Sequence, residues 1–305
     1  MVTNMQALVC YNPFSGKQKF ERHLPYVTRQ LETKYAKVDV FRSLYKKAIT
    51  TYIESYGKDY DLIVIAGGDG SLNEAITGLM KLEKRPVLAY IPFGTVNDVG
   101  HLLKLKRSIK GVLKIILEGK TAKMDIGKIE DKYFAYGCGI GKFTNVSYDV
   151  PNKLKKRFGK LAYFIEAAKH LQKTEKMNLK IYCNGEEIKE DFYVVLVLNS
   201  ARIAGFRPHR VVKPKLNDGI FDLTLVSKAI MRLSIYNLIF FFLLGERYKI
   251  GLKNLKISNC KIVSEEEVAY NVDGEYAFKK KEVSIEVVKE AISIIVSEKA
   301  LKKYF

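Results

Sequence analysis

A buried strand, a glycine-rich turn and a helix start follow one another in Leu62-Ile63-Val64-Ile65-Ala66-Gly67-Gly68-Asp69-Gly70-Ser71-Leu72-Asn73-Glu74. The apolar run predicts a strand covered on both faces. The three glycines let the backbone turn sharply and approach a ligand closely. Such a turn at a helix N-terminus presents N–H groups to an anion such as phosphate. Asp69 would then need a cation, most simply Mg²⁺, between its carboxylate and a phosphate; the alternative is an ordinary turn with Asp69 as the N-cap.

Two other polar turns follow predicted strands. The strand expected over 7–11 leads into Asn12-Pro13-Phe14-Ser15-Gly16-Lys17, which offers a hydroxyl, backbone amides and a positive charge. The strand expected over 87–91 leads into Pro92-Phe93-Gly94-Thr95-Val96-Asn97-Asp98. In open parallel sheets the ligand lies outside the carboxyl ends of the strands. All three turns fall at such ends, so their convergence favours a phosphate site.

The fold class follows from the order of the elements. Strands alternate with amphipathic helices up to about residue 117, which predicts an α/β N-terminal domain over 1–120 with a doubly wound, mainly parallel sheet. After Gly119 strands follow strands, which predicts a mostly antiparallel, β-rich C-terminal domain over 121–297. A last helix, 298–305, is expected to pack back on the first domain. The strands expected in the second domain are 123–129, 133–138, 179–183, 193–198, 221–226, 268–272, 283–288 and 292–296.

The composition indicates a basic globular protein. The net charge is +19, from 52 Lys and Arg against 33 Asp and Glu over 305 residues. This charge predicts attraction to nucleic acid, an acidic membrane surface or phosphorylated ligands, although a general lysine bias would give the same composition. No apolar run reaches the ~18–20 residues that span a bilayer, and 1–6 does not resemble a signal peptide. The four cysteines are scattered, as in reduced core thiols of a cytosolic protein.

Two predicted helices interrupt the second domain. The segment 153–172 mixes basic and apolar side chains, so it either lies on an anionic membrane surface or packs with a solvated basic face. The segment 231–244 contains a short apolar run, which forms either a buried helix or a wall for acyl chains.

Two acidic loops add candidate chemistry. In Lys215-Leu216-Asn217-Asp218-Gly219-Ile220, Asp218 either binds a metal together with nearby carbonyls or belongs to an ordinary Asp-Gly turn. In Asn271-Val272-Asp273-Gly274-Glu275, two carboxylates flank a glycine at a strand end, either beside a substrate hydroxyl or in an exposed hairpin. Together with the three turns, these loops predict a phosphotransferase cleft. Asp69 and Asp98 would hold Mg²⁺, and Asp273 would take the hydroxyl proton, with Glu275 as helper or alternative base.

The sequence resembles the soluble bacterial diacylglycerol kinases, which are relatives of sphingosine and ceramide kinases. Six motifs carry the resemblance over nearly the whole chain. They are the three turns and Met124-Asp125-Ile126-Gly127, Asn217-Asp218-Gly219 and Val272-Asp273-Gly274-Glu275. Departures are small: Ser71 and Ser43 stand where relatives have Thr, and Val99 where an aromatic residue is common.

The resemblance implies a site. A catalytic Mg²⁺ would be held through Asp69 and Asp98, and a structural Mg²⁺ by the Asp218 carboxylate and the carbonyls of Lys215 and Ile220. The general base would lie in the Asp273-Gly274-Glu275 motif. The implied ATP contacts are Asn12, Pro13, Phe14, Ser15, Gly16, Ser43, Gly68, Asp69, Gly70, Ser71, Leu72, Asn73, Glu74 and Thr95.

The expected activity is transfer of the γ-phosphate of ATP to the hydroxyl of diacylglycerol, giving phosphatidic acid. Alternatives are a kinase for another lipid hydroxyl, such as a sphingoid base or phosphatidylglycerol, and, further away, NAD kinase. A non-catalytic basic protein that binds membrane or nucleic acid is the alternative from another class, against which the intact carboxylates speak. The resemblance also implies a cytoplasmic protein at the inner membrane surface and a possible homodimer. No nucleic-acid partner is expected, because the sequence has no arginine-rich arm, zinc finger or RNA motif with interleaved aromatic residues.

Overall fold

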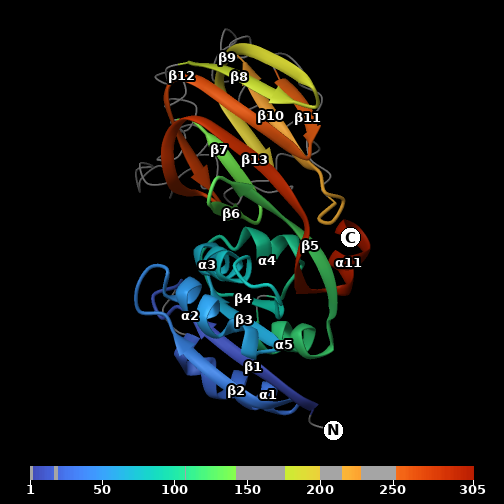
Figure 1. Cartoon of the computed structure of the whole chain (residues 1–305). Coiled ribbons are helices and arrows are strands. Elements are labelled where there is room, and N and C mark those ends of the chain that lie inside the picture. Colours follow the sequence, from blue (N-terminus) through green and yellow to red (C-terminus); the bar gives the residue numbers. More distant parts are fainter. Residues whose placement is uncertain (1–2, 17–19, 107, 142–175, 200–214, 228–251) are drawn as a thin grey trace, which may run out of the picture.

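The computed structural model describes residues 3–16, 20–106, 108–141, 176–199, 215–227 and 252–305. Figure 1 shows an α/β region that carries the N-terminus and a β-rich region stacked on it. The expected division into these two regions is confirmed. The boundary placed near residue 120 stays a prediction.

The N-terminal region is built on four strands with helices on both sides. The strands are β1 (Thr3–Tyr11), β2 (Tyr35–Arg42), β3 (Leu62–Gly67) and β4 (Val87–Pro92). β1 pairs in parallel with β2 and β3, and β3 pairs in parallel with β4. All six residues of β3 are buried, as its apolar run predicts.

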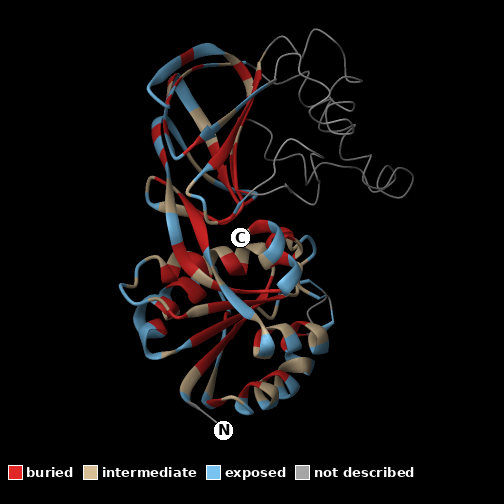
Figure 2. Ribbon diagram, turned by 90° about the vertical axis from the view of Figure 1, so that its right-hand side faces the viewer, coloured by how far each residue is buried: buried red, intermediate tan, exposed pale blue. Residues whose placement is uncertain are grey.

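Successive residues of a strand point to opposite faces, and each face has its own helices. One face of β1 and β3 packs with α2 (Ala48–Tyr56), α3 (Asp69–Leu79) and α4 (Asp98–Leu102). The other face packs with α1 (Leu24–Glu32), which follows a 3₁₀ turn at Phe20–His23, and with α5 (Ile109–Glu118). Figure 2 shows this central sheet as a buried layer between partly exposed helices.

The β-rich region has a second core. Its pairings are antiparallel, and its centre includes Phe134, Phe192, Phe221 and Tyr270. The strands are β5 (Lys120–Ile129), β6 (Lys132–Phe134), β7 (Gly137–Ile140), β8 (Met177–Cys183), β9 (Glu186–Leu198), β10 (Phe221–Ser227), β11 (Leu252–Ile257), β12 (Asn259–Val272) and β13 (Glu275–Val296).

One strand, β13, joins the two regions. Its first part pairs with β12, and its last part pairs with β5 and, at Ile294, with β4. The described strands thereby form one 13-stranded sheet. The final helix α11 (Glu298–Tyr304) buries Ala300 and Tyr304 in the core of the N-terminal region.

Several strand predictions need correction. The expected strands 283–288 and 292–296 are parts of β13, because the register slips between them without ending the strand. The expected strand 133–138 is two strands, β6 and β7, separated at Ala135 and Tyr136. The strand expected over 268–272 is the end of the longer β12, and β11 was not expected.

Candidate active site

The three glycine-containing turns meet at the carboxyl ends of β1, β3 and β4. The backbone N–H of Asn12 donates to the Ala66 carbonyl at 3.1 Å, and that of Phe93 donates to the Gly67 carbonyl at 2.8 Å. A Cβ on Gly94 would lie 2.5 Å from the Cα of Gly68. The glycines are therefore required for the turns to pack against one another.

Asp69 and Asp98 lie side by side in this cluster. The Asp69 carboxylate accepts hydrogen bonds from the backbone N–H of Asp98 at 3.1 Å and of Val99 at 3.4 Å. Asp98 is fully buried. Burial, and then the negative charge of Asp98, raises the pKa of Asp69 to about 6. The alternative that Asp69 only caps its helix is wrong, because Gly68 is the N-cap residue and Asp69 bonds to another turn.

Two neighbouring carboxylates suit a divalent cation. Mg²⁺ is held in kinases by one or two carboxylates, substrate phosphates and water. A cation here would offset the Asp98 charge, which adds to the effect of burial on the pKa of Asp69. The described residues contain no group of three or more His, Cys, Asp or Glu side chains placed around one metal position. The pair thus fits a metal shared with a phosphate ligand and not a metal held by protein alone.

Asp273 is a buried carboxylate with four N–H donors. It accepts from the side-chain amide of Asn73 at 2.8 Å and from the backbone N–H groups of Ala135, Tyr136 and Gly137 at 2.8–3.1 Å. Tyr136 also donates its hydroxyl to the Asp273 carbonyl at 2.6 Å. Burial raises the pKa of Asp273, and the four donors act against that rise. These bonds fix the turn between β12 and β13.

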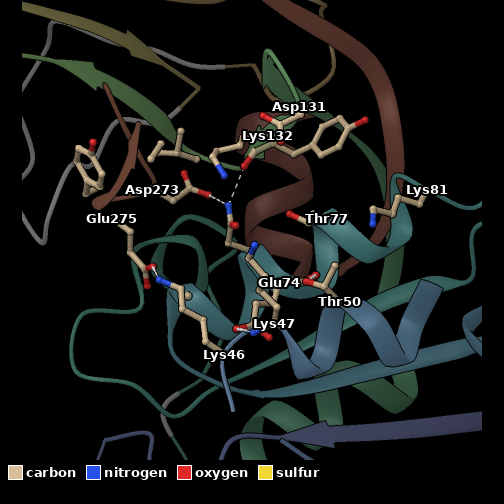
Figure 3. A pocket seen from close by; sticks show the side chains of 16 residues that line it. Lys46, Lys47, Thr50, Glu74, Thr77, Lys81, Asp131, Lys132, Asp273 and Glu275 are labelled. Atoms are coloured by element: carbon tan, nitrogen blue, oxygen red, sulfur yellow. Dashed lines mark hydrogen bonds and ion pairs between the residues drawn. The ribbon is translucent and has the colours of Figure 1, made fainter. Parts of the chain in front are cut away.

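Glu275 lies two residues further along and faces open space. Its side chain is 58% exposed and forms an ion pair of 3.1 Å with Lys46. A Cβ on Gly70 would lie 2.8 Å from Glu275 Oε1, so this glycine gives the carboxylate room beside the helix start. Figure 3 shows the two acids leaving the same turn in different directions, Asp273 toward the protein and Glu275 toward Lys46.

A cavity of about 390 Å³ lies beside the turns. It contains part of the implied ATP-binding set together with Glu275: its lining includes Asn12, Phe14, Ser15, Ser43, Gly68, Gly70, Ser71 and Glu74. Pro13, Gly16, Asp69, Leu72, Asn73 and Thr95 are not among its lining residues. Leu72 is fully buried in the apolar core, and Asn73 joins α3 to Tyr133 and Asp273.

The loop over 215–220 lies apart from the turns, beside β5 and α11. Asp218 accepts a hydrogen bond from the backbone N–H of Ile220 at 3.0 Å. Asp125 accepts from the N–H groups of Gly219 and Glu290, each at 2.6 Å, so it ties the loop to β13. Burial is the main cause that raises the pKa of Asp125, and the Asp218 charge adds to it. Oxygen donors and neighbouring acids fit a structural divalent cation.

Three residues near the site had no assigned role. Asp125 belongs to a motif that carries the resemblance, so it could have been singled out. Tyr136 and Lys46 lie in stretches without a sequence signal, and only the fold brings them to Asp273 and Glu275.

Some of the expected features lie outside the described residues. They are Lys17 and the two segments expected as helices, 153–172 and 231–244. Among the described helices, none combines the length and apolar character that crossing a membrane requires.

Sequence comparison places this site in a known group of proteins. The family described as "Diacylglycerol kinase catalytic domain" matches residues 6–129. The diacylglycerol kinase of Staphylococcus carnosus is 34% identical over 279 residues, covering 89% of both chains. That of Staphylococcus haemolyticus is 35% identical over 284 residues, covering 90% of this chain and 83% of the relative. This chain belongs to the diacylglycerol kinase family.

The fold of this diacylglycerol kinase family member is also found in solved structures. A crystal structure of a diacylglycerol kinase from Bacillus anthracis has a TM-score of 0.77 at 22% identity, covering 98% of this chain and 100% of the other. The family match and the relatives at 34–35% identity confirm the resemblance found in the motifs and the expectation of an enzyme of the lipid kinase type. The chain matches a family of kinases, so the alternative of a non-catalytic binding protein is not supported.

Proposed function

We propose that this protein transfers the γ-phosphate of ATP to the hydroxyl of diacylglycerol, giving phosphatidic acid, with Mg²⁺ at Asp69 and Asp98. The observation that carries the proposal is the position of Glu275. Its exposed carboxylate lines the same cavity as the glycine-rich turns, next to the helix start at Gly70. Phosphoryl transfer needs a positioned phosphate, neutralised charge and a base for the attacking hydroxyl, and this cleft offers groups for each.

The proposed base is Glu275 and not Asp273. Both Asp273 oxygens already accept hydrogen bonds, from four donors in total, so little capacity remains for a substrate proton. Glu275 is held only by an exposed ion pair, and such pairs are weak. The acceptor oxygen would form a bond to the γ-phosphorus, the bond to the ADP oxygen would break, and the hydroxyl proton would move to Glu275. Asp273 would position the turn that presents Glu275.

The nucleotide would lie across the three turns. Gly68, Gly70 and Ser71 at the start of α3 line the cavity, and the backbone N–H groups of a helix start favour phosphate oxygens. Bound Mg²⁺ would neutralise charge on those oxygens, and Asp69 and Asp98 would orient it. Phe14 lines the cavity and is 63% exposed, so its ring would stack on a nucleobase bound there. Asn12, Ser15 and Ser43 would supply polar contacts.

The finer features of the assignment are also proposals. Helices on both faces of the N-terminal sheet support the doubly wound arrangement. The +19 charge supports peripheral attachment to an anionic membrane. A cytoplasmic location and a homodimer follow from the resemblance, and no nucleic-acid partner is expected because the motifs that bind nucleic acid are missing from the sequence.

The experiment follows labelled γ-phosphate from Mg-ATP into a panel of acceptors in mixed micelles. The panel holds diacylglycerol, sphingosine, ceramide and phosphatidylglycerol, with NAD as a soluble control. Phosphatidic acid as the main product supports the proposal. Labelling of another lipid would keep the mechanism and change the substrate, and labelling of NAD would overturn the lipid assignment. Equal activity in the wild type and Glu275→Gln would overturn the role of Glu275.

A further inference from the structure

A second cavity runs along one face of α3, on the other side of Glu275 from the proposed nucleotide cavity. Its volume is about 270 Å³. Gly70, Asn73, Thr77 and Lys81 line it at helical spacing. The two cavities share Lys46, Gly70, Glu74 and Glu275 as a common wall. We call this second space the α3 groove. It is large enough for a headgroup and too small for a whole lipid.

Most of the acids that line the α3 groove already accept hydrogen bonds or form an ion pair within the protein. Asp273 is surrounded by its four donors. Glu74 accepts from the backbone N–H groups of Lys47 at 2.8 Å and of Ile49 at 3.2 Å, at the start of α2. Glu275 pairs with Lys46. The remaining acid of the lining, Asp131, is exposed at the turn between β5 and β6.

Four lysines surround the same space. Figure 3 shows Lys46 and Lys47 on one side, Lys132 opposite them and Lys81 at the far end, with Thr77 pointing into the space between. Lys81 pairs with Glu54 at 2.6 Å. For Lys47 and Lys132 no ion pair with another described residue is found. The lining acids equal the lysines in number, but none of them forms an ion pair with Lys47 or Lys132, so these two ammonium groups remain available to a ligand.

We propose that the α3 groove is an anion site that binds a phosphate group through Lys47 and Lys132, separately from the phosphates of the nucleotide. Ammonium groups from two different elements that line one groove together with Thr77 suit a tetrahedral anion better than a flat apolar group. The phosphate comes either from solution or from a phospholipid headgroup. If the proposed function holds, this groove lies beside the lipid acceptor; the anion site itself does not rest on that function.

The test compares three proteins with the wild type. Lys47→Gln with Lys132→Gln removes both charges and keeps a flexible polar side chain at each position. Thr77→Glu places a negative charge in the groove without removing a lysine. Lys58→Gln with Lys84→Gln is the matched control, since both lysines are exposed and lie outside the groove lining. Melting temperatures of the free proteins verify that each variant folds.

Two titrations distinguish the sources of the phosphate. Inorganic phosphate is titrated calorimetrically in saturating Mg-ADP, so that the nucleotide site is already filled. Vesicles of phosphatidylcholine, with and without phosphatidic acid, are titrated by co-sedimentation. We expect the Lys47/Lys132 variant to bind phosphate or phosphatidic acid about tenfold more weakly than the wild type. Thr77→Glu should bind more weakly still, and the Lys58/Lys84 control should match the wild type.

The outcomes are decisive in both directions. Weaker binding of inorganic phosphate by the Lys47/Lys132 variant supports a site for free phosphate. Weaker binding of phosphatidic acid vesicles alone supports a headgroup site. The proposal is overturned if the Lys58/Lys84 control loses as much affinity as the Lys47/Lys132 variant. It is also overturned if the groove variants bind as tightly as the wild type. A parallel loss of ADP affinity in the groove variants also overturns it, because the lysines would then belong to the nucleotide site. Failure of the wild type to bind Mg-ADP would instead count against the proposed function.

Discussion

Asp273 and Glu275 are two residues apart and have opposite surroundings. One carboxylate is buried among N–H donors, and the other is exposed beside Lys46. The sequence places both acids in one motif but cannot separate their roles, because the donors to Asp273 come from Asn73 and from residues 135–137, all more than a hundred positions away. Burial and hydrogen bonding distinguish what spacing leaves open.

Substitution should separate the two acids. Glu275→Gln is expected to lower kcat by about 10²–10⁴, as for loss of a general base, with an unchanged melting temperature. Asp273→Asn replaces an acceptor oxygen by an amide NH₂ facing N–H donors, so it should lower the free energy of unfolding by about 1–3 kcal/mol. Steady-state kinetics and denaturant unfolding measure the two effects. A fully stable but inactive Asp273→Asn would return the base role to Asp273.

Asp69 should make the metal-free protein less stable as pH rises. Its pKa is about 6 in the folded protein, against 3.8 for an unperturbed aspartate, so the folded state holds the proton more tightly than the unfolded chain does. The free energy of unfolding therefore falls between pH about 4 and about 6, by up to about 3 kcal/mol from this group. Asp69→Asn should be more stable than the wild type near neutral pH, and the difference should vanish below pH about 4. Thermal melting across pH tests this, and a wild type that is the more stable protein at neutral pH would contradict it.

At the scale of elements, the strongest sequence signals are local. The apolar run of β3 and the glycines after it predict a buried strand and a tight turn, and both are found. β13 could not be predicted as one strand, because the irregular stretch between Val288 and Ile292 resembles a break when its partner β5 is unknown. Glu74 had been implied as an ATP contact, yet its carboxylate binds the start of α2. No local pattern marks that bond, since the two helices meet only in the folded chain.

The loop over 215–220 should respond to metal as a unit. If Mg²⁺ binds there, it should raise the free energy of unfolding of the wild type by about 2–3 kcal/mol at about 100 times its dissociation constant. Asp218→Ala should lose this gain while keeping its affinity for ADP. Melting with Mg²⁺ or with excess chelator measures the effect, and Asp69→Asn is the control that keeps the loop intact. Equal gains in Asp218→Ala and the wild type would refute the structural metal.

For the complete chain, the sequence predicts the charge and the two regions but not the contact between those regions. The net charge of +19 is a sum over residues and needs no fold. The two-region architecture follows from the change in element order near Gly119. The contact between the regions does not follow, because Asn73 and Lys46 reach Asp273 and Glu275 only through the folded chain.

Binding to membranes should depend on lipid charge and on salt. We expect the protein to co-sediment with vesicles that contain phosphatidylglycerol and to bind pure phosphatidylcholine vesicles much more weakly. Raising the ionic strength from about 0.1 M to about 1 M shortens the Debye length from about 10 Å to about 3 Å, so most of the binding should be lost. Binding that is unaffected by salt and lipid charge would show that the +19 charge has no role in attachment.

The course of β13 has a consequence for how the protein is made. Ile294, Val296 and Tyr304 complete the core that begins with Leu8 and Ile63. A ribosome delivers these residues only after the whole β-rich region has been synthesised. The glycine-rich turns therefore leave the ribosome early, but the core beneath them lacks these residues until translation has passed Tyr304. During synthesis the folding of the N-terminal region depends on residues 294–304. A product that stops before them would contain the glycine-rich motifs without the complete core that holds these turns in place.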